Sequence, residues 1–134
     1  MAKNNYEVTG WTGWIGFASV MLYLAGFFHI IAGFTALFND KLYVLTPTTL
    51  WTMDITSWGW VHVIGGILAI IAASSLLYGN TFGRIFAIII AVLSALANLA
   101  FIPIYPIWSI IIMVIDALVI YAVVVHADEM KALR

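Results

Sequence analysis

The sequence contains no cysteine and very little charge. Of its 134 residues, 8% are Asp, Glu, Lys or Arg, whereas 65% are hydrophobic. The absence of cysteine excludes disulfide bonds, thiolate nucleophiles and cysteine-ligated metals. The formal net charge of −1 offers no basic surface for a nucleic acid. Because soluble domains carry about a quarter charged residues, this composition excludes a water-soluble monomer.

Three long stretches of the chain lack any formal charge. They cover residues 8–39, 55–83 and 85–115. Each stretch is longer than the roughly 20 residues that cross the hydrocarbon core of a bilayer. The first is also too long for the core of a cleaved signal peptide, so we interpret it as a retained membrane span.

The sequence predicts an all-α membrane protein, a single-domain bundle of four transmembrane helices over residues 1–134. Gly79 and Asn80 suit the end of a helix and a tight turn, so the helices on either side are expected to form an antiparallel hairpin. Pro103 and Pro106 divide the last uncharged stretch, because proline lacks a backbone donor and disfavours helix in the preceding residue. The expected spans are 11–38, 58–78, 82–102 and 106–126, with an outer loop at 39–57.

The 39–57 loop contains a segment that is unusually apolar for a solvated linker. Residues 42–53 include two runs of β-forming side chains on either side of Thr46-Pro47-Thr48-Thr49. This pattern favours a short outer loop or a β-hairpin cap over the bundle, since a hairpin pairs its own backbone groups. A helix lying in the membrane interface is the alternative.

The basic residues predict the orientation of the chain in the membrane. Lys3, Arg84, Lys131 and Arg134 fall on one side of the predicted spans, and only Lys41 falls on the other. Because Lys and Arg are retained on the cytoplasmic side, both termini are expected in the cytoplasm. The charged tail that follows His126 is expected to be a solvated helix end.

Four polar side chains inside the spans are the candidates for a binding site: His29, His62, Asn98 and Asp116. An ionised group costs about 2.5–3.5 kcal/mol at the centre of a membrane helix, so such residues are expected to face the bundle interior. One lies on each predicted span, and together they are expected to converge in the outer half of the bundle. The helical rise, however, predicts a difference in depth of about 6 Å between the two histidines.

Each candidate has a structural and a functional interpretation. Asp116 is either a proton or cation site or a hydrogen-bonding group that holds the last span in register. His29 and His62 are either packing residues or a pair of ligands for a metal ion or a haem. The structural interpretation of Asp116 is favoured because buried polar groups commonly form hydrogen bonds between helices. That of the histidines is favoured because the two differ in expected depth and neither helix carries a second histidine, so no cofactor is predicted.

Several short motifs resemble those of a known family. They are Gly10-Trp11, Phe28-His29-Ile30-Ile31-Ala32-Gly33, Trp58-Gly59-Trp60-Val61-His62, Gly83-Arg84, Ser94-Ala95-Leu96-Ala97-Asn98 and Pro103-Ile104-Tyr105-Pro106-Ile107-Trp108. In this order they resemble the small four-span membrane proteins of bacteria, actinobacteria among them, that are classed as a domain of unknown function. The resemblance extends over residues 10–126 and includes an Asp at the position of Asp116. It implies the four-span architecture and no particular reaction, substrate or cofactor.

Together with the resemblance, these observations favour a non-enzymatic protein of the bacterial cytoplasmic (inner) membrane that associates with itself or with a larger membrane protein within the lipid bilayer. A small proton or cation channel or transporter that uses Asp116 with His29, His62 and Asn98 is the alternative. A histidine-ligated haem or metal protein is the third hypothesis.

Overall fold

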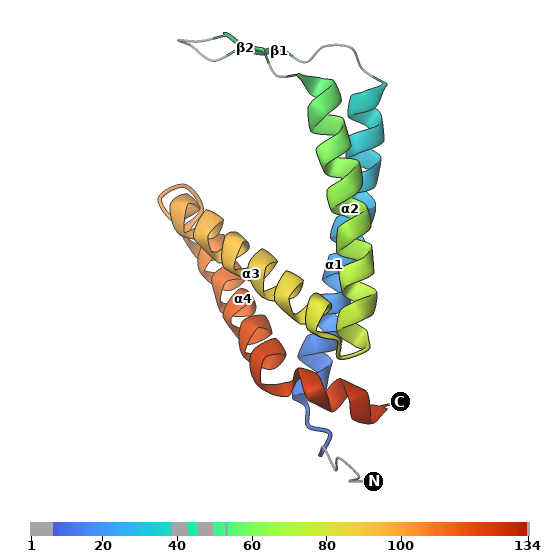
Figure 1. Ribbon diagram of the computed structural model, residues 1–134. Helices are drawn as coiled ribbons and strands as arrows, with labels where there is room; N and C mark the ends of the chain where they lie inside the picture. Colours follow the sequence, from blue (N-terminus) through green and yellow to red (C-terminus); the bar gives the residue numbers. More distant parts are fainter. Residues whose placement is uncertain (1–6, 39–42, 46–49, 53, 134) are drawn as a thin grey trace. The chain divides into compact units, whose positions relative to one another are not determined.

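The computed structural model describes residues 7–38, 43–45, 50–52 and 54–133. These residues form four long helices, which are labelled in Figure 1: α1 (Trp11–Leu37), α2 (Ile55–Leu77), α3 (Thr81–Phe101) and α4 (Pro106–His126). A 3₁₀ helix, η1 (Ala127–Leu133), follows α4. Each of the four long helices is long and apolar enough to cross a membrane. The prediction of an all-α, four-span membrane protein is therefore confirmed.

The start of α2 differs from the prediction. The helix begins at Ile55, three residues before the expected position, because Asp54 caps its first turn. The Asp54 carboxylate accepts hydrogen bonds from the Thr56 N–H at 3.1 Å and from the Ser57 hydroxyl at 2.6 Å. The bond from Thr56 satisfies a backbone amide that has no partner within the helix. The connection between α1 and α2 is correspondingly shorter than the predicted 39–57 loop.

Both expected turns between the later helices are present. After α2, Gly79 adopts a positive φ of 67°, which glycine tolerates without strain, and its N–H bonds to the Leu76 carbonyl at 2.9 Å. After α3, the Tyr105 N–H bonds back to the Phe101 carbonyl at 2.9 Å. Pro106 then occupies the first turn of α4, where its missing donor costs nothing.

The structure divides into two compact units. One unit contains residues 23–70, which are the second half of α1, the first two thirds of α2 and the connection between them. The other contains residues 1–22 and 71–134, and therefore α3, α4, η1 and the remaining parts of α1 and α2. We call them the 23–70 unit and the terminal unit.

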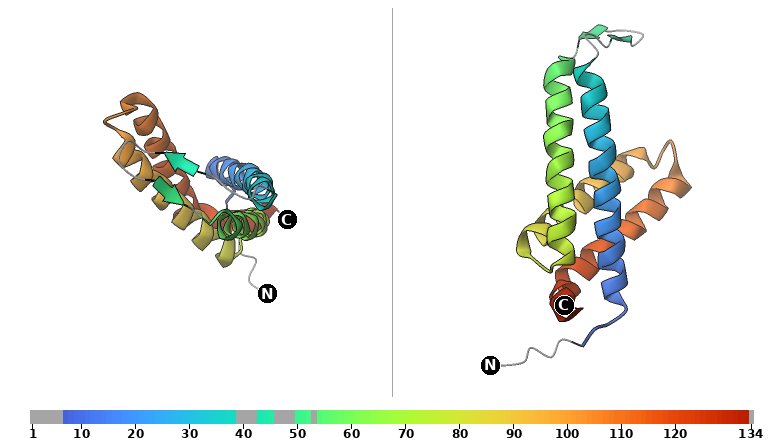
Figure 2. Two further views of the ribbon diagram at one scale, coloured as in Figure 1. Left: turned by 90° about the horizontal axis from the view of Figure 1, so that it is seen from above. Right: turned by 90° about the vertical axis from the view of Figure 1, so that its right-hand side faces the viewer.

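In the 23–70 unit, α1 and α2 pack backbone to backbone through two pairs of glycines. A Cβ at Gly33 would lie 2.7 Å from the Gly59 carbonyl oxygen, and one at Gly26 would lie 2.7 Å from the Gly66 carbonyl oxygen. On each helix the two glycines are seven residues apart, which is about two helical turns, so both contacts lie on one face of the helix. The two helices lie side by side in both views of Figure 2.

In the terminal unit, α3 and α4 form an antiparallel hairpin (Figure 1). Gly83, near the start of α3, packs directly on the end of α2: a Cβ there would lie 2.2 Å from the Leu76 backbone nitrogen. The Gly83 N–H also donates to the Ser75 hydroxyl at 3.0 Å. Small side chains make this close packing possible, and the buried apolar residues of the unit include Ala72, Ala73, Ala87, Ala91 and Ala122.

The connection between α1 and α2 contains two very short strands. β1 (Tyr43–Leu45) and β2 (Leu50–Thr52) pair in antiparallel fashion, with Tyr43 opposite Thr52. The predicted turn at 46–49 lies outside the described residues. Three paired residues on each strand make at most a marginally stable hairpin, and a packed cap over the helices is not supported.

Candidate functional site

His29 on α1 and His62 on α2 lie next to each other in the 23–70 unit. Their ring centroids are 5.0 Å apart. The predicted difference in depth is wrong, because α2 begins earlier than expected and the glycine pairs set the register. His29 follows Gly26 by three residues, and His62 follows Gly59 by three, so both rings project between the two glycine contacts.

The imidazole of His62 is oriented by its own helix. Its Nδ1 lies 3.0 Å from the Trp58 carbonyl oxygen, and the Trp58 ring lies 4.1 Å from the imidazole, centroid to centroid. A carbonyl oxygen only accepts hydrogen bonds, so Nδ1 carries the proton in this contact. In the neutral ring, Nε2 then has the free lone pair. Within the described residues, no group of three or more His, Asp or Glu side chains is placed to hold a metal ion.

Asp116 is buried on α4 in the terminal unit. The Ser94 side chain of α3 lies close to its carboxyl group across the hairpin. The carboxylate oxygen Oδ2 is buried and has no hydrogen-bond partner among the described residues. A buried carboxyl group with one unpartnered oxygen retains the capacity to bind a proton or a cation.

Asn98 is half-buried and bonds within its own helix. Its side-chain amide donates to the Ser94 carbonyl at 2.9 Å, four residues earlier on α3. Asn98 and Asp116 therefore share Ser94 as a neighbour, through its backbone and its side chain respectively. The two histidines belong to the 23–70 unit and these two residues to the terminal unit, so the convergence of all four remains a prediction.

A second polar cluster joins the start of α1 to the η1 helix. The Glu129 carboxylate accepts hydrogen bonds from the Thr9 N–H at 2.7 Å and from the Thr9 hydroxyl at 2.8 Å, and it also contacts the His126 ring. Trp11 stacks on His126 with centroids 5.5 Å apart and meets Tyr121 edge to face at 4.7 Å. The prediction of a solvated helix end is wrong here, because Glu129 and Met130 are buried.

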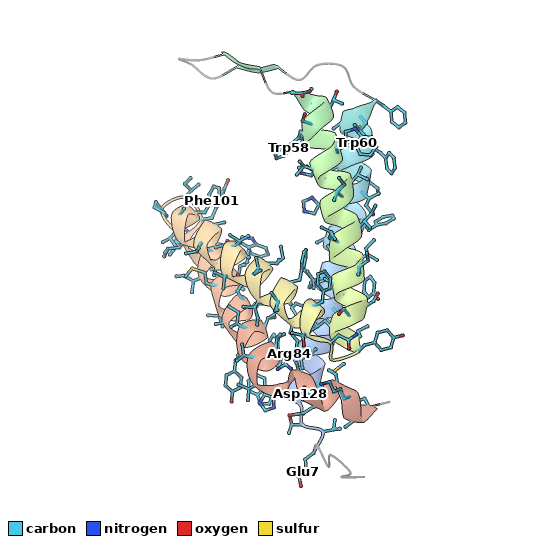
Figure 3. All side chains as sticks on the ribbon, viewed as in Figure 1. Glu7, Trp58, Trp60, Arg84, Phe101 and Asp128 are labelled. Atoms are coloured by element: carbon cyan, nitrogen blue, oxygen red, sulfur yellow. The ribbon has the colours of Figure 1, made fainter. Side chains whose placement is uncertain are left out.

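An ion-pair network lies beside this cluster. The Arg84 guanidinium at the start of α3 pairs with Asp128 at 3.1 Å, and Lys131 reaches the same carboxylate oxygen at 2.9 Å. Arg84 also donates to the Val124 carbonyl at 3.4 Å, near the end of α4. Figure 3 shows Arg84 and Asp128 at this end of the terminal unit. The network connects the start of α3 with the end of α4 and with η1. The Glu129 cluster likewise connects the start of α1 with η1.

Comparison with protein families gives a match over most of the chain. The model of a domain of unknown function, DUF7144, matches residues 14–128, which include all four candidate residues and the Arg84–Asp128 ion pair. The chain belongs to the DUF7144 family. No curated protein and no solved structure matches the chain.

Membership of DUF7144 agrees with the predicted class of protein, a domain of unknown function, and assigns no chemistry to the candidate residues. The sequence reasoning missed Thr9, Arg84 and Glu129 as a group. One signal was available: Arg84 is the only charged residue between Asp54 and Asp116, and the tail holds carboxylates that could pair with it. Contacts separated by 120 residues, such as the one between Thr9 and Glu129, have no local signature.

Proposed function

We propose that this protein is a bacterial inner-membrane protein that acts by associating with a second copy of itself, without catalysing a reaction. The supporting observation is an unoccupied glycine surface on α1. Gly26, Gly33, Gly59, Gly66 and Gly83 all approach the backbone of a neighbouring helix, whereas Gly13 and Gly16 have nothing within 4 Å of an added Cβ. In membranes, exposed small residues allow the backbone of another helix to approach closely.

An open hollow lies at this glycine surface. It has a volume of about 380 Å³ and is lined by Gly10, Gly13, Trp14, Phe17 and Ile115, all in the terminal unit. The same face offers both a recess at Gly13 and a projecting ring at Phe17, which is 39% exposed. A surface that carries a recess and a projection side by side can be self-complementary about a twofold axis. A second copy of the chain is therefore the occupant we propose.

Filling the recess tests the proposal. We expect the purified parent protein to form dimers in mild detergent and in nanodiscs, and Gly13→Leu to weaken dimerisation at least tenfold. Gly65→Leu is the matched control, because Gly65 also has open space around an added Cβ but belongs to α2 in the 23–70 unit and does not line the hollow. Mass photometry of nanodiscs, or energy transfer between labelled copies in vesicles, measures the effect.

Two results would contradict self-association. One is a strictly monomeric parent that copurifies with no protein. The other is a monomer with a lipid in the hollow, detected by native mass spectrometry and lost in Gly13→Leu.

The orientation with both termini in the cytoplasm is part of the proposal. Arg84 and Lys131 share one carboxylate in the terminal unit, and the start of α1 bonds to the η1 helix that carries Lys131. The basic residues therefore collect at one end of this unit. This clustering supports retention of that end on the cytoplasmic side.

A proton or cation site at Asp116 is the second candidate function. It is favoured by the unpartnered Oδ2 of this buried carboxyl group. We expect proteoliposomes to conduct protons under a membrane potential and Asp116→Asn to abolish the current. Ser109→Ala is the control, because Ser109 is also buried on α4 with an unpartnered oxygen among the described residues. The absence of current from the parent protein would remove this candidate.

A further inference from the structure

We propose that His29 and His62 together bind one divalent transition-metal ion of the zinc and copper class. Both imidazoles come from the same chain, so the site does not depend on self-association. The inference rests on the spacing of the rings, the orientation of His62 and the position of the pair along the helices.

The spacing of the two rings suits a single shared ion. In a tetrahedral zinc site, Zn–N distances of about 2.0–2.1 Å place the centres of two bound imidazoles about 5 Å apart. The observed separation of the ring centroids is 5.0 Å. Axial histidines on opposite faces of a haem would need a separation of about 6 Å or more, with the porphyrin between them. The geometry therefore favours one bare ion over a haem.

The hydrogen bond made by His62 prepares the ring for metal binding. Its Nδ1–H donates to the Trp58 carbonyl at 3.0 Å, which directs the free lone pair to Nε2. Histidines that bind metals generally donate their other ring N–H to a carbonyl or carboxylate in this way, which fixes the tautomer and the ring orientation. The adjacent Trp58 ring, 4.1 Å away, further restricts rotation of the imidazole.

The glycine pairs hold the two ligands at this spacing. Gly26 contacts Gly66 and Gly33 contacts Gly59 on either side of the histidines, so the backbones of α1 and α2 cannot move closer there. Separation of the helices would move the rings apart. The glycines are thus positioning residues for the site, and they make no contact with the ion.

The pair lies near one end of the two helices, since His62 is about 10 Å along α2 from its first residue, Ile55. α1 has 27 residues and is therefore about 40 Å long, about 10 Å longer than the core is thick. Trp58 and Trp60, within one turn of His62, are about half exposed, as expected for rings in the membrane interface (Figure 3). His29 is exposed and His62 half-buried, so water can complete the coordination of the ion. Imidazole with water suits zinc and copper ions.

The experiment is a Zn²⁺ titration of the full-length protein in nanodiscs, with a chromophoric chelator as competitor and a purification tag free of histidine. We expect one ion per chain. His29→Gln and His62→Gln should each weaken binding at least tenfold, whereas His126→Gln, which alters the remaining histidine of the chain, should bind like the parent. Electron paramagnetic resonance of bound Cu²⁺ should show two nitrogen ligands in the parent and one in either variant.

A pair of variants that retain both histidines tests whether the glycine contacts position the metal ligands. Gly66→Ala should weaken Zn²⁺ binding and Gly65→Ala should not, because only the former displaces the helices. Unchanged affinity in the His29→Gln/His62→Gln double variant, or loss of binding in His126→Gln, would overturn the proposal. A Soret band in the purified protein that disappears in His62→Gln would also overturn it.

Discussion

Asp54 shows how one side chain determines where a membrane helix begins. Its carboxylate accepts bonds from the Ser57 hydroxyl and the Thr56 N–H at the start of α2. The hydrogen bond from the Ser57 side chain is the main reason that the pKa of Asp54 lies below the usual 3.8. Because its pKa is lower in the folded protein than in the unfolded chain, ionised Asp54 stabilises the fold.

This pKa shift predicts a pH dependence of stability. The contribution of Asp54 is fully present above pH 3.8 and is lost as the pH falls through the lower folded-state pKa. Asp54→Asn keeps the capping oxygen but does not titrate. We therefore expect the melting temperatures of parent and variant to differ near neutral pH and to converge in acid, measured by circular dichroism in detergent.

The control for this experiment is Glu7→Gln, which removes another exposed carboxylate. Its melting temperature should follow the parent across the same pH range. A gap between Asp54→Asn and the parent that stays constant from neutral to acid pH would show that ionised Asp54 does not stabilise α2.

At the scale of the helices, alanine substitutions at the two adjacent glycines of α2 are expected to have opposite effects on stability. A Cβ at Gly66 would lie 2.6 Å from the Gly26 carbonyl oxygen and 2.7 Å from the Ile30 side chain, whereas one at Gly65 would meet nothing within 4 Å. Gly66→Ala must therefore push the helices apart, at a cost of about 1–3 kcal/mol. Gly65→Ala should be neutral or stabilising by up to about 1 kcal/mol, because alanine favours helix.

Unfolding of both variants in mixed micelles of increasing SDS content measures this difference. The midpoint of Gly66→Ala should fall well below that of the parent, and the midpoint of Gly65→Ala should not. Equal midpoints for the two variants would mean that α1 and α2 are not packed through Gly26 and Gly66.

The positions of the helices could be predicted from the sequence, whereas the residues through which they pack against each other could not. Uncharged stretches, Gly79 and the two prolines located three of the four helix starts, because length and turn chemistry are local properties. Asp54 was assigned to the loop, although its Asp-Ile-Thr-Ser sequence suits a helix cap. α1 and α2 are apolar on all sides, so hydrophobic periodicity could not indicate which residues face a neighbour.

The candidate site was predictable in its residues but not in its geometry. The cost of polar groups in lipid identified His29, His62, Asn98 and Asp116. The proximity of the histidines depends on which glycines of α1 and α2 oppose each other, a property of the packed pair. Likewise, the Glu129 cluster depends on contacts between the two ends of the chain, which only the fold brings together.

At the scale of the whole molecule, the absence of cysteine allows a direct test of orientation. A single introduced cysteine reports on one position without background labelling. Thr56 is exposed in the first turn of α2. Ala132 is exposed on η1, which follows the end of the last span. If the cluster of Arg84 and Lys131 keeps its end in the cytoplasm, an impermeant maleimide should label Thr56→Cys in intact cells. Ala132→Cys should react only after the membrane is permeabilised. The reverse pattern would invert the proposed topology, and equal labelling of both positions in intact cells would contradict it.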